Sequence, residues 1–209
     1  MKNDEHIEVK LPDSVPLMVL PEAMLFPHSV LPLFIFEQRY RDMLAWALAN
    51  DRMFCVAMMK PGVSEVRSPD DFFHVSGLGL IRACVQNPDG TSHMILHGLQ
   101  RVRFVGFDKS RPFYVARIEA LKSELGDAEV LDLLSEQIIR LCKKLGEAGY
   151  ELPESIAQLL RNGSEAELLG DVVGSAFVRH PVHRQALLEQ PVVSERLRRL
   201  LAYLRTESE

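Results

Sequence analysis

The chain has 209 residues, of which 47% are hydrophobic and 25% are charged, values that are ordinary for a soluble protein with a substantial core. Its formal net charge of −5 disfavours a broad surface that neutralises nucleic-acid phosphates. Because residues 1–10 lack the apolar core of an export signal and no run of about 18 apolar residues follows, we expect a cytoplasmic protein that does not enter a membrane.

Short apolar segments separated by proline and glycine fill the first part of the chain. Buried strands are predicted at residues 17–20, 30–36 and 53–59. Pro32 places the second of these at a sheet edge, because proline has no N–H to donate to a neighbouring strand. Residues 37–50 predict a helix whose apolar face consists of Tyr40, Met43, Leu44, Ala47 and Leu48.

The next segment predicts a β-hairpin and two further strands. Residues 78–86 and 93–98 flank Asp89-Gly90, a pair that tolerates the positive φ of a tight turn. Residues 101–107 alternate between polar and apolar side chains, which predicts that Val102 and Phe104 point inward and that Arg101 and Arg103 point outward. Residues 113–120 form another strand, so we expect a twisted, partly closed, barrel-like sheet.

Long segments of helical period dominate after residue 120. Residues 121–126 form a connection, and Ser164-Glu-Ala-Glu167 has the pattern of a capping box that starts a helix. The predicted helices are residues 127–145, 154–161, 164–177, 181–189 and 194–204. The chain is therefore predicted to be α+β, with a β-rich part in residues 1–120 and a helical bundle in residues 121–209.

Three collinear motifs resemble the amino-terminal domain of Lon proteases. The first is the proline-bounded stretch of residues 16–43, which includes Leu-Phe-Pro and Ile-Phe-Glu-Gln-Arg-Tyr-Arg. The second comprises Gly77-Leu-Gly-Leu-Ile-Arg, Asp89-Gly90 and Gly98-Leu-Gln-Arg-Val-Arg-Phe, and the third comprises Gln185-Ala-Leu-Leu-Glu and Val192-Val-Ser-Glu-Arg-Leu. The chain departs from the family pattern at His28, where glycine is usual, and at Gln38, where proline is usual.

The resemblance implies a PUA-like β pseudo-barrel followed by a helical bundle, and a role in substrate recognition. In Lon proteases an ATPase module and a serine–lysine peptidase follow this region. The sequence contains no G-x-x-x-x-G-K-[ST] phosphate-binding pattern. We therefore expect no catalytic residue, no cofactor, no ATP hydrolysis and no Lon-type proteolysis from this chain.

A surface for unfolded or partly folded polypeptides is the function that we predict. Such a domain would serve as an adaptor or modulator of proteolysis, acting with a separate protease or chaperone. The candidate surface combines an exposed loop with the segment that enters the first helix, although Phe34 and Phe36 are equally compatible with the core. It consists of Leu25, Phe26, Pro27, Phe34, Phe36, Arg39 and Tyr40. A homodimer through a strand edge or the last helix is also compatible with the sequence.

Two alternative functions remain open at this stage. A PUA-like module could bind RNA through a strip formed by Arg82, Arg101 and Arg103, and a small hydrolase could have a polar site between the two parts. The histidine pairs 93/97 and 180/183 lack further ligands at familiar spacing, so no metal site is predicted. Cys55, Cys84 and Cys142 lie in apolar sequence and are expected to be buried, reduced cysteines.

Overall fold

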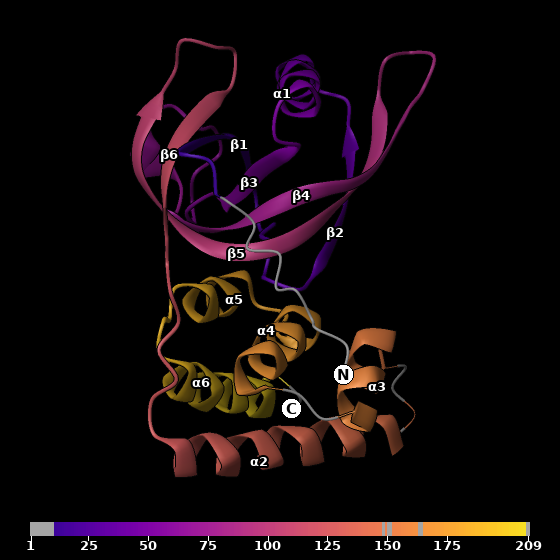
Figure 1. The fold of residues 1–209 in the computed structure, drawn as a ribbon, viewed down its shortest axis with the longest axis vertical. Helices are drawn as coiled ribbons and strands as arrows, with labels where there is room; N and C mark the ends of the chain where they lie inside the picture. Colours follow the sequence, from indigo (N-terminus) through magenta and orange to yellow (C-terminus); the bar gives the residue numbers. More distant parts are fainter. Residues whose placement is uncertain (1–10, 148, 150–151, 163–164, 208–209) are drawn as a thin grey trace, which may run out of the picture.

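The computed structural model describes residues 11–147, 149, 152–162 and 165–207, and it places a mixed sheet above a layer of helices (Figure 1). We call residues 11–120 the β lobe and residues 121–207 the helical lobe. The predicted α+β fold with a helical carboxy-terminal part is confirmed.

The β lobe contains six strands, one α-helix and a short 3-10 helix at Pro69–Asp71. Its elements are β1 (Ser14–Leu20), β2 (Val30–Ile35), α1 (Gln38–Ala49), β3 (Met53–Met58), β4 (Val75–Gln86), β5 (Ser92–Asp108) and β6 (Tyr114–Ala120). The elements of the helical lobe are α2 (Ala128–Glu147), α3 (Glu154–Asn162), α4 (Ala166–Phe177), α5 (Pro181–Leu188) and α6 (Val193–Thr206).

The sheet closes on itself and leaves one strand outside the closure. Its order is β2-β5-β4-β3-β1-β6, and an additional pairing between β5 and β6 completes the barrel. Strands β1 and β3 are parallel, and the other pairs are antiparallel. Strand β2 pairs with β5 and forms the edge of the sheet, as Pro32 predicts. Helix α1 covers one end of the barrel (Figure 1).

Strand β5 differs from the sequence prediction because it is one long strand of 17 residues rather than two short ones. Gly98, which the prediction takes as a break, lies inside β5 and pairs with Gly79 of β4. Gly90 has a φ of 83°, and the predicted Asp89-Gly90 turn joins β4 to β5. The hairpin is therefore confirmed, and β5 is long enough to pair with β2, β4 and β6.

The segment from Met24 to Phe26 connects the two lobes. Met24 and Phe26 belong to the hydrophobic cluster built mainly by α2, α4, α5 and α6, whereas Leu25 belongs to the barrel core beneath α1. Successive side chains of an extended segment point to opposite sides, so this short stretch serves both cores. This short stretch therefore links the core of the helical lobe to the core of the barrel.

Glycine permits this segment to lie directly against the sheet. A Cβ atom at Gly98 would stand 1.8 Å from the carbonyl oxygen of Phe26, and one at Gly77 would stand 2.1 Å from that of Leu25. Both distances are shorter than any van der Waals contact, so a side chain at either position would displace the crossing backbone. The glycines of the second sequence motif thus have a steric explanation.

Replacement of Gly98 by alanine should destabilise the protein severely. The new methyl group would collide with backbone rather than with a flexible side chain, and we expect a loss of about 3 kcal/mol in the free energy of unfolding. Urea denaturation measures the change, with Gly146→Ala as the control. At Gly146 the Cβ would meet only the end of Leu152, at 3.0 Å. Equal stability of the two variants would contradict the proposed close approach.

His28 holds a backbone conformation that favours glycine. Its φ is 61°, in the left-handed region, and its N–H donates to the Gly98 carbonyl at 2.9 Å. Because a side chain costs about 1–2 kcal/mol in this region, we expect His28→Gly to raise the free energy of unfolding by about 1 kcal/mol. His28→Ala removes the same ring without relieving the strain, so equal gains from both variants in urea denaturation would refute the explanation.

Candidate functional site

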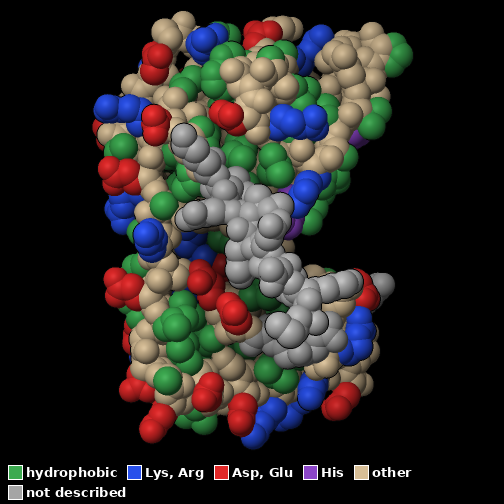
Figure 2. All heavy atoms as spheres, viewed as in Figure 1, with side chains coloured by type: hydrophobic (Ala, Val, Ile, Leu, Met, Phe, Trp, Pro, Cys, Tyr) green, Lys and Arg blue, Asp and Glu red, His purple; other side chains and the backbone are tan. Residues whose placement is uncertain are grey.

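An apolar patch covers the outer face of β2 and the adjoining β4–β5 hairpin. Val30, Phe34, Phe36 and Val85 are 58%, 48%, 60% and 65% exposed, values that are high for large hydrophobic side chains. We define the β2 patch as Val30, Pro32, Phe34, Phe36, Ala83, Val85, His93 and Ile95. Figure 2 shows hydrophobic side chains along the right-hand rim of the upper lobe, where these elements lie.

Strand pairing aligns the β2 patch in rows that cross three strands. Phe34 lies opposite His93, which lies opposite Val85, and Pro32, Ile95 and Ala83 form the next row. The ring centroid of Phe34 is 4.7 Å from that of His93 and 5.9 Å from that of Phe36. These side chains therefore form one continuous surface, because residues directly opposite on neighbouring strands are within contact distance.

The backbone of β2 offers an edge beside this surface. The Gly98 N–H donates to the Ser29 carbonyl at 2.9 Å, and hydrogen-bonded positions alternate along an antiparallel pair. Val30, Pro32 and Phe34 therefore direct their backbone polar groups away from β5. Pro32 contributes only a carbonyl there, which limits the strand pairing that this edge accepts.

The structure divides the seven residues of the predicted surface among different environments. Phe34, Phe36 and Arg39 are exposed, so the alternative that places Phe34 and Phe36 in the core is wrong. The residues that are buried are Leu25, Phe26, Pro27 and Tyr40. The expectation that residues 25–27 form an exposed loop is wrong, because this segment fills the space between the two cores.

Tyr40 and Arg39 are engaged within the β lobe. The Tyr40 hydroxyl donates to the Val19 carbonyl at 2.8 Å, and burial raises its pKa even though Arg39 acts in the opposite direction. The Arg39 guanidinium lies over the Tyr40 ring at 4.5 Å and forms an ion pair with Glu37 at 2.8 Å. Arg39 and Tyr40 line a separate hollow with Phe113 and Tyr114, so they do not extend the β2 patch.

Sequence reasoning missed Val30 and Val85, which are the most exposed aliphatic residues of the patch. A signal for Val85 was available, because the Asp89-Gly90 turn fixes the register that places Val85 opposite His93. Packing under α1 buries the other face of β2 and so determines which face remains outside. The seven-residue apolar run of residues 30–36 does not reveal that packing.

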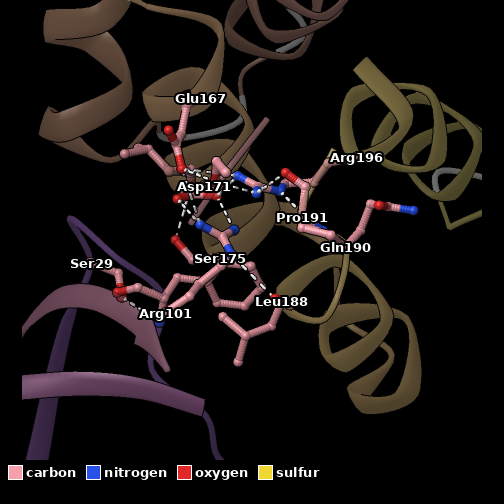
Figure 3. A network of polar contacts seen from close by, with 12 residues as sticks. Ser29, Arg101, Glu167, Asp171, Ser175, Leu188, Gln190, Pro191 and Arg196 are labelled. Carbon is pink, nitrogen blue, oxygen red and sulfur yellow. Dashed lines mark hydrogen bonds and ion pairs between the residues drawn. The ribbon is translucent and has the colours of Figure 1, made fainter. Parts of the chain in front are cut away.

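A buried network of charged side chains joins the lobes (Figure 3). Asp171 of α4 is 0% exposed and accepts hydrogen bonds from both Arg101 of β5 and Arg196 of α6. The Nη1–Oδ2 distance to Arg101 is 2.7 Å, and the Nη1–Oδ1 distance to Arg196 is 3.1 Å. The second nitrogen of Arg101 also contacts Asp171, which makes this pair bidentate.

Backbone carbonyls and Glu167 satisfy the remaining donors of the two arginines. The Arg101 Nε donates to the Leu188 carbonyl at 3.1 Å, and the Arg196 Nε donates to the Gln190 carbonyl at 3.0 Å. The Glu167 carboxylate lies 3.6 Å from Arg101 and 3.5 Å from Arg196. Two cations thus face two anions. Burial and the neighbouring Arg101 lower the pKa of Arg196, whereas Asp171 and Glu167 raise it.

This network corrects two sequence predictions. Arg101 is buried rather than outward-facing, because the helical lobe covers this part of β5. The predicted arginine strip for RNA is therefore interrupted at its centre.

The predicted capping box begins at Ser164, which lies outside the described residues. Its last residue, Glu167, contacts the Ser123 hydroxyl as well as the two arginines.

Ser123 is the residue between the lobes that most nearly matches the hydrolase alternative. Its hydroxyl donates to Glu167 and accepts from Arg196 Nη2 at 2.9 Å, and no histidine within the described ranges hydrogen-bonds to it. The arrangement favours a structural role over nucleophilic catalysis.

The other titratable side chains singled out in the sequence lie in different environments. His183 Nδ1 lies 2.8 Å from Glu207 Oε1, and Cys55 and Cys142 are buried as expected, whereas Cys84 is only partly buried. Burial raises the pKa of both thiols, that of Cys142 to about 11. Among the residues that the structure describes, no three His, Cys, Asp or Glu side chains are grouped as metal ligands. No helix within these ranges is long and apolar enough to span a membrane.

Sequence comparison identifies relatives along almost the whole chain. Residues 14–206 match the family described as "ATP-dependent protease La (LON) substrate-binding domain". The Lon protease of Dictyoglomus thermophilum is 24% identical over 199 residues, which cover 95% of this chain and 25% of that protein. The Lon protease of Escherichia coli is 24% identical over 193 residues, with coverages of 92% and 25%. The chain thus spans about a quarter of the length of these curated relatives.

Two solved structures share the fold. The amino-terminal domain of the Mycobacterium avium complex Lon protease matches with a TM-score of 0.72 and 19% identity, covering 92% of this chain and 98% of that domain. The Lon N-terminal domain protein from Xanthomonas campestris matches with a TM-score of 0.65 and 21% identity, with coverages of 91% and 98%. At these identities the likeness concerns the arrangement of the chain.

Asp171→Asn should destabilise the protein by about 3–5 kcal/mol, because it leaves two buried guanidinium groups facing a single carboxylate. Chemical denaturation measures the loss. Glu136→Gln is the matched control, since Glu136 forms an exposed ion pair with Arg140 and its side chain is 64% exposed. We expect a change below about 0.5 kcal/mol for the control. An Asp171→Asn variant as stable as the control would contradict the structural role of the network.

Proposed function

The chain belongs to the family of ATP-dependent protease La (LON) substrate-binding domains, and we propose that it binds unfolded or extended polypeptides through the β2 patch. The observation that carries this proposal is the pair Phe34 and Phe36, which lie exposed and in contact beside a strand edge that pairs with no other strand of the described residues. Large exposed apolar patches on soluble domains are typical of contact surfaces.

The chemistry of the β2 patch suits a chain in extended conformation. Its side chains are apolar or aromatic and present no fixed charge, so they select exposed hydrophobic residues rather than a particular sequence. Covering one Phe side chain contributes about 1.5–3 kcal/mol. The free backbone groups of Val30 and Phe34 add hydrogen bonds to a strand laid alongside β2, whereas Pro32 restricts how far such pairing extends.

We further propose that the bound polypeptide is passed to other proteins. The relatives named above are Lon proteases about four times longer than the matched region, in keeping with a coverage of 25% in both. A domain that holds an unfolded chain, without itself cleaving it, would act as an adaptor or modulator for a separate protease or chaperone. Only the binding step rests on the geometry of the β2 patch.

The double variant Phe34→Ser/Phe36→Ser should lose polypeptide binding. Removal of both rings takes away several kcal/mol of apolar contact, so we expect the affinity to fall about tenfold or more. Fluorescence anisotropy with a labelled, chemically unfolded protein measures the change. Both side chains are exposed, so the thermal unfolding midpoint should change little.

The control is Val105→Ser/Leu133→Ser, which removes two apolar side chains that are 44% and 57% exposed and lie outside the β2 patch. This variant should bind as the wild type does. Absence of saturable binding by the folded wild type would refute the proposed function. If both double variants lose affinity for the polypeptide equally, binding would depend on exposed apolar surface in general and not on the β2 patch.

A further inference from the structure

A cavity at the junction of the lobes adjoins the β2 patch. Its volume is about 280 Å³, and it lies between the start of β2 and the helices α3, α4 and α5. We call it the junction pocket. Its lining includes Ser29, Val30, Ser155, Ser175 and Arg184, and Val30 also belongs to the β2 patch. A polypeptide that covers the patch therefore passes the mouth of this pocket.

Arg184 is the unusual component of the junction pocket. Its Nε–H is buried without a hydrogen-bond partner, and no ion pair or hydrogen bond connects its guanidinium group to another residue in the described ranges. Arg101 and Arg196, by contrast, are fully engaged at the same junction. Burial lowers the pKa of Arg184, although a guanidinium group remains charged at neutral pH.

The rest of the lining leaves this charge uncompensated. Among the described residues that line the pocket, none is an aspartate or a glutamate. The Ser29 hydroxyl donates to the Phe26 carbonyl at 2.7 Å, and the Ser175 hydroxyl donates to the Val172 carbonyl at 3.0 Å. Both hydroxyl hydrogens are thus engaged with backbone carbonyls, and a neutral serine does not compensate the charge of Arg184. A partly desolvated cation without a partner is unfavourable unless a ligand supplies the opposite charge.

We propose that the junction pocket binds a carboxylate of the polypeptide that occupies the β2 patch, with Arg184 as its ion-pair partner. This inference rests on the proposed function and adds a charge preference to it. The planar guanidinium fork matches a carboxylate in a bidentate arrangement. Because a water molecule takes about 30 Å³ of liquid, the pocket has room for a carboxylate and part of its hydration shell. The domain would then select apolar segments that carry an acidic group.

Matched peptides test this charge preference. The probes are fluorescein-labelled extended peptides of alternating apolar and serine residues, identical except for one glutamate or glutamine, each with a free or an amidated carboxyl terminus. Wild-type protein should bind the glutamate peptide about tenfold more tightly than its glutamine twin, as expected for one charge-assisted hydrogen-bonded pair. The amidated forms show whether a side chain or the terminal carboxylate enters the pocket.

Arg184→Gln should abolish this difference and leave the affinity for the amidated glutamine peptide within about twofold of the wild-type value. Arg199→Gln is the control, since Arg199 is an exposed arginine on α6 and its replacement changes the net charge equally. The control should keep the full preference. Because the Arg184 guanidinium has no partner to lose among the described residues, Arg184→Gln should unfold thermally at or above the wild-type midpoint.

The outcomes separate the inference from the function on which it rests. If none of the peptides binds to folded wild-type protein, the proposed function fails together with the inference. If all four peptides bind with equal affinity, or if Arg184→Gln retains the preference for glutamate, the β2 patch stands and the carboxylate pocket is refuted. If Arg199→Gln also loses the preference for the glutamate peptide, the preference is an effect of net charge and the carboxylate pocket is refuted.

Discussion

The paired burial of Arg101, Asp171 and Arg196 constrains the rest of the structure most strongly. Charges removed from water must be matched by opposite charge and hydrogen bonds, and a displaced partner leaves an uncompensated ion in an apolar interior. Arg101 comes from β5, Asp171 from α4 and Arg196 from α6, so the match requires the lobes to meet in one orientation. The Phe26 side chain inserts between the lobes and packs in the cluster of the helical lobe. This contact requires the lobes to meet in the same orientation.

The position of the β2 patch follows from that junction. The chain leaves β1, passes through Met24–Phe26 in the shared core and emerges at His28 to begin β2. Gly77 and Gly98 let the crossing backbone lie against the sheet, and β2 then pairs with the first part of β5, residues 92–97. The fixed contact between lobes therefore aligns the exposed face of β2 with the pocket that contains Arg184. The two proposed binding features are consequences of one packing arrangement.

Local signals in the sequence identified the elements that depend on nearby residues. The Asp89-Gly90 turn, the edge position of Pro32 and the amphipathic α1 all lie where spacing and turn chemistry place them. The failures concern contacts between distant segments. Arg101 stands at a polar position of an alternating strand, which predicts a solvated face. The helical lobe, which begins about 20 residues later, covers that face. Residues 25–27 look like a proline-marked loop, and only the shared core shows why they are buried.

Native-state hydrogen exchange tests the central claim that the buried ion network makes the two lobes a single cooperative unit. The relevant amides are those of β5 around Arg101 and those of α4 around Asp171, which the network joins. If opening the junction requires global unfolding, both sets should exchange with the same free energy and the same dependence on denaturant. Exchange of the α4 amides at a much lower free energy, while those of β5 stay protected, would show that the helical lobe opens by itself and would contradict the account.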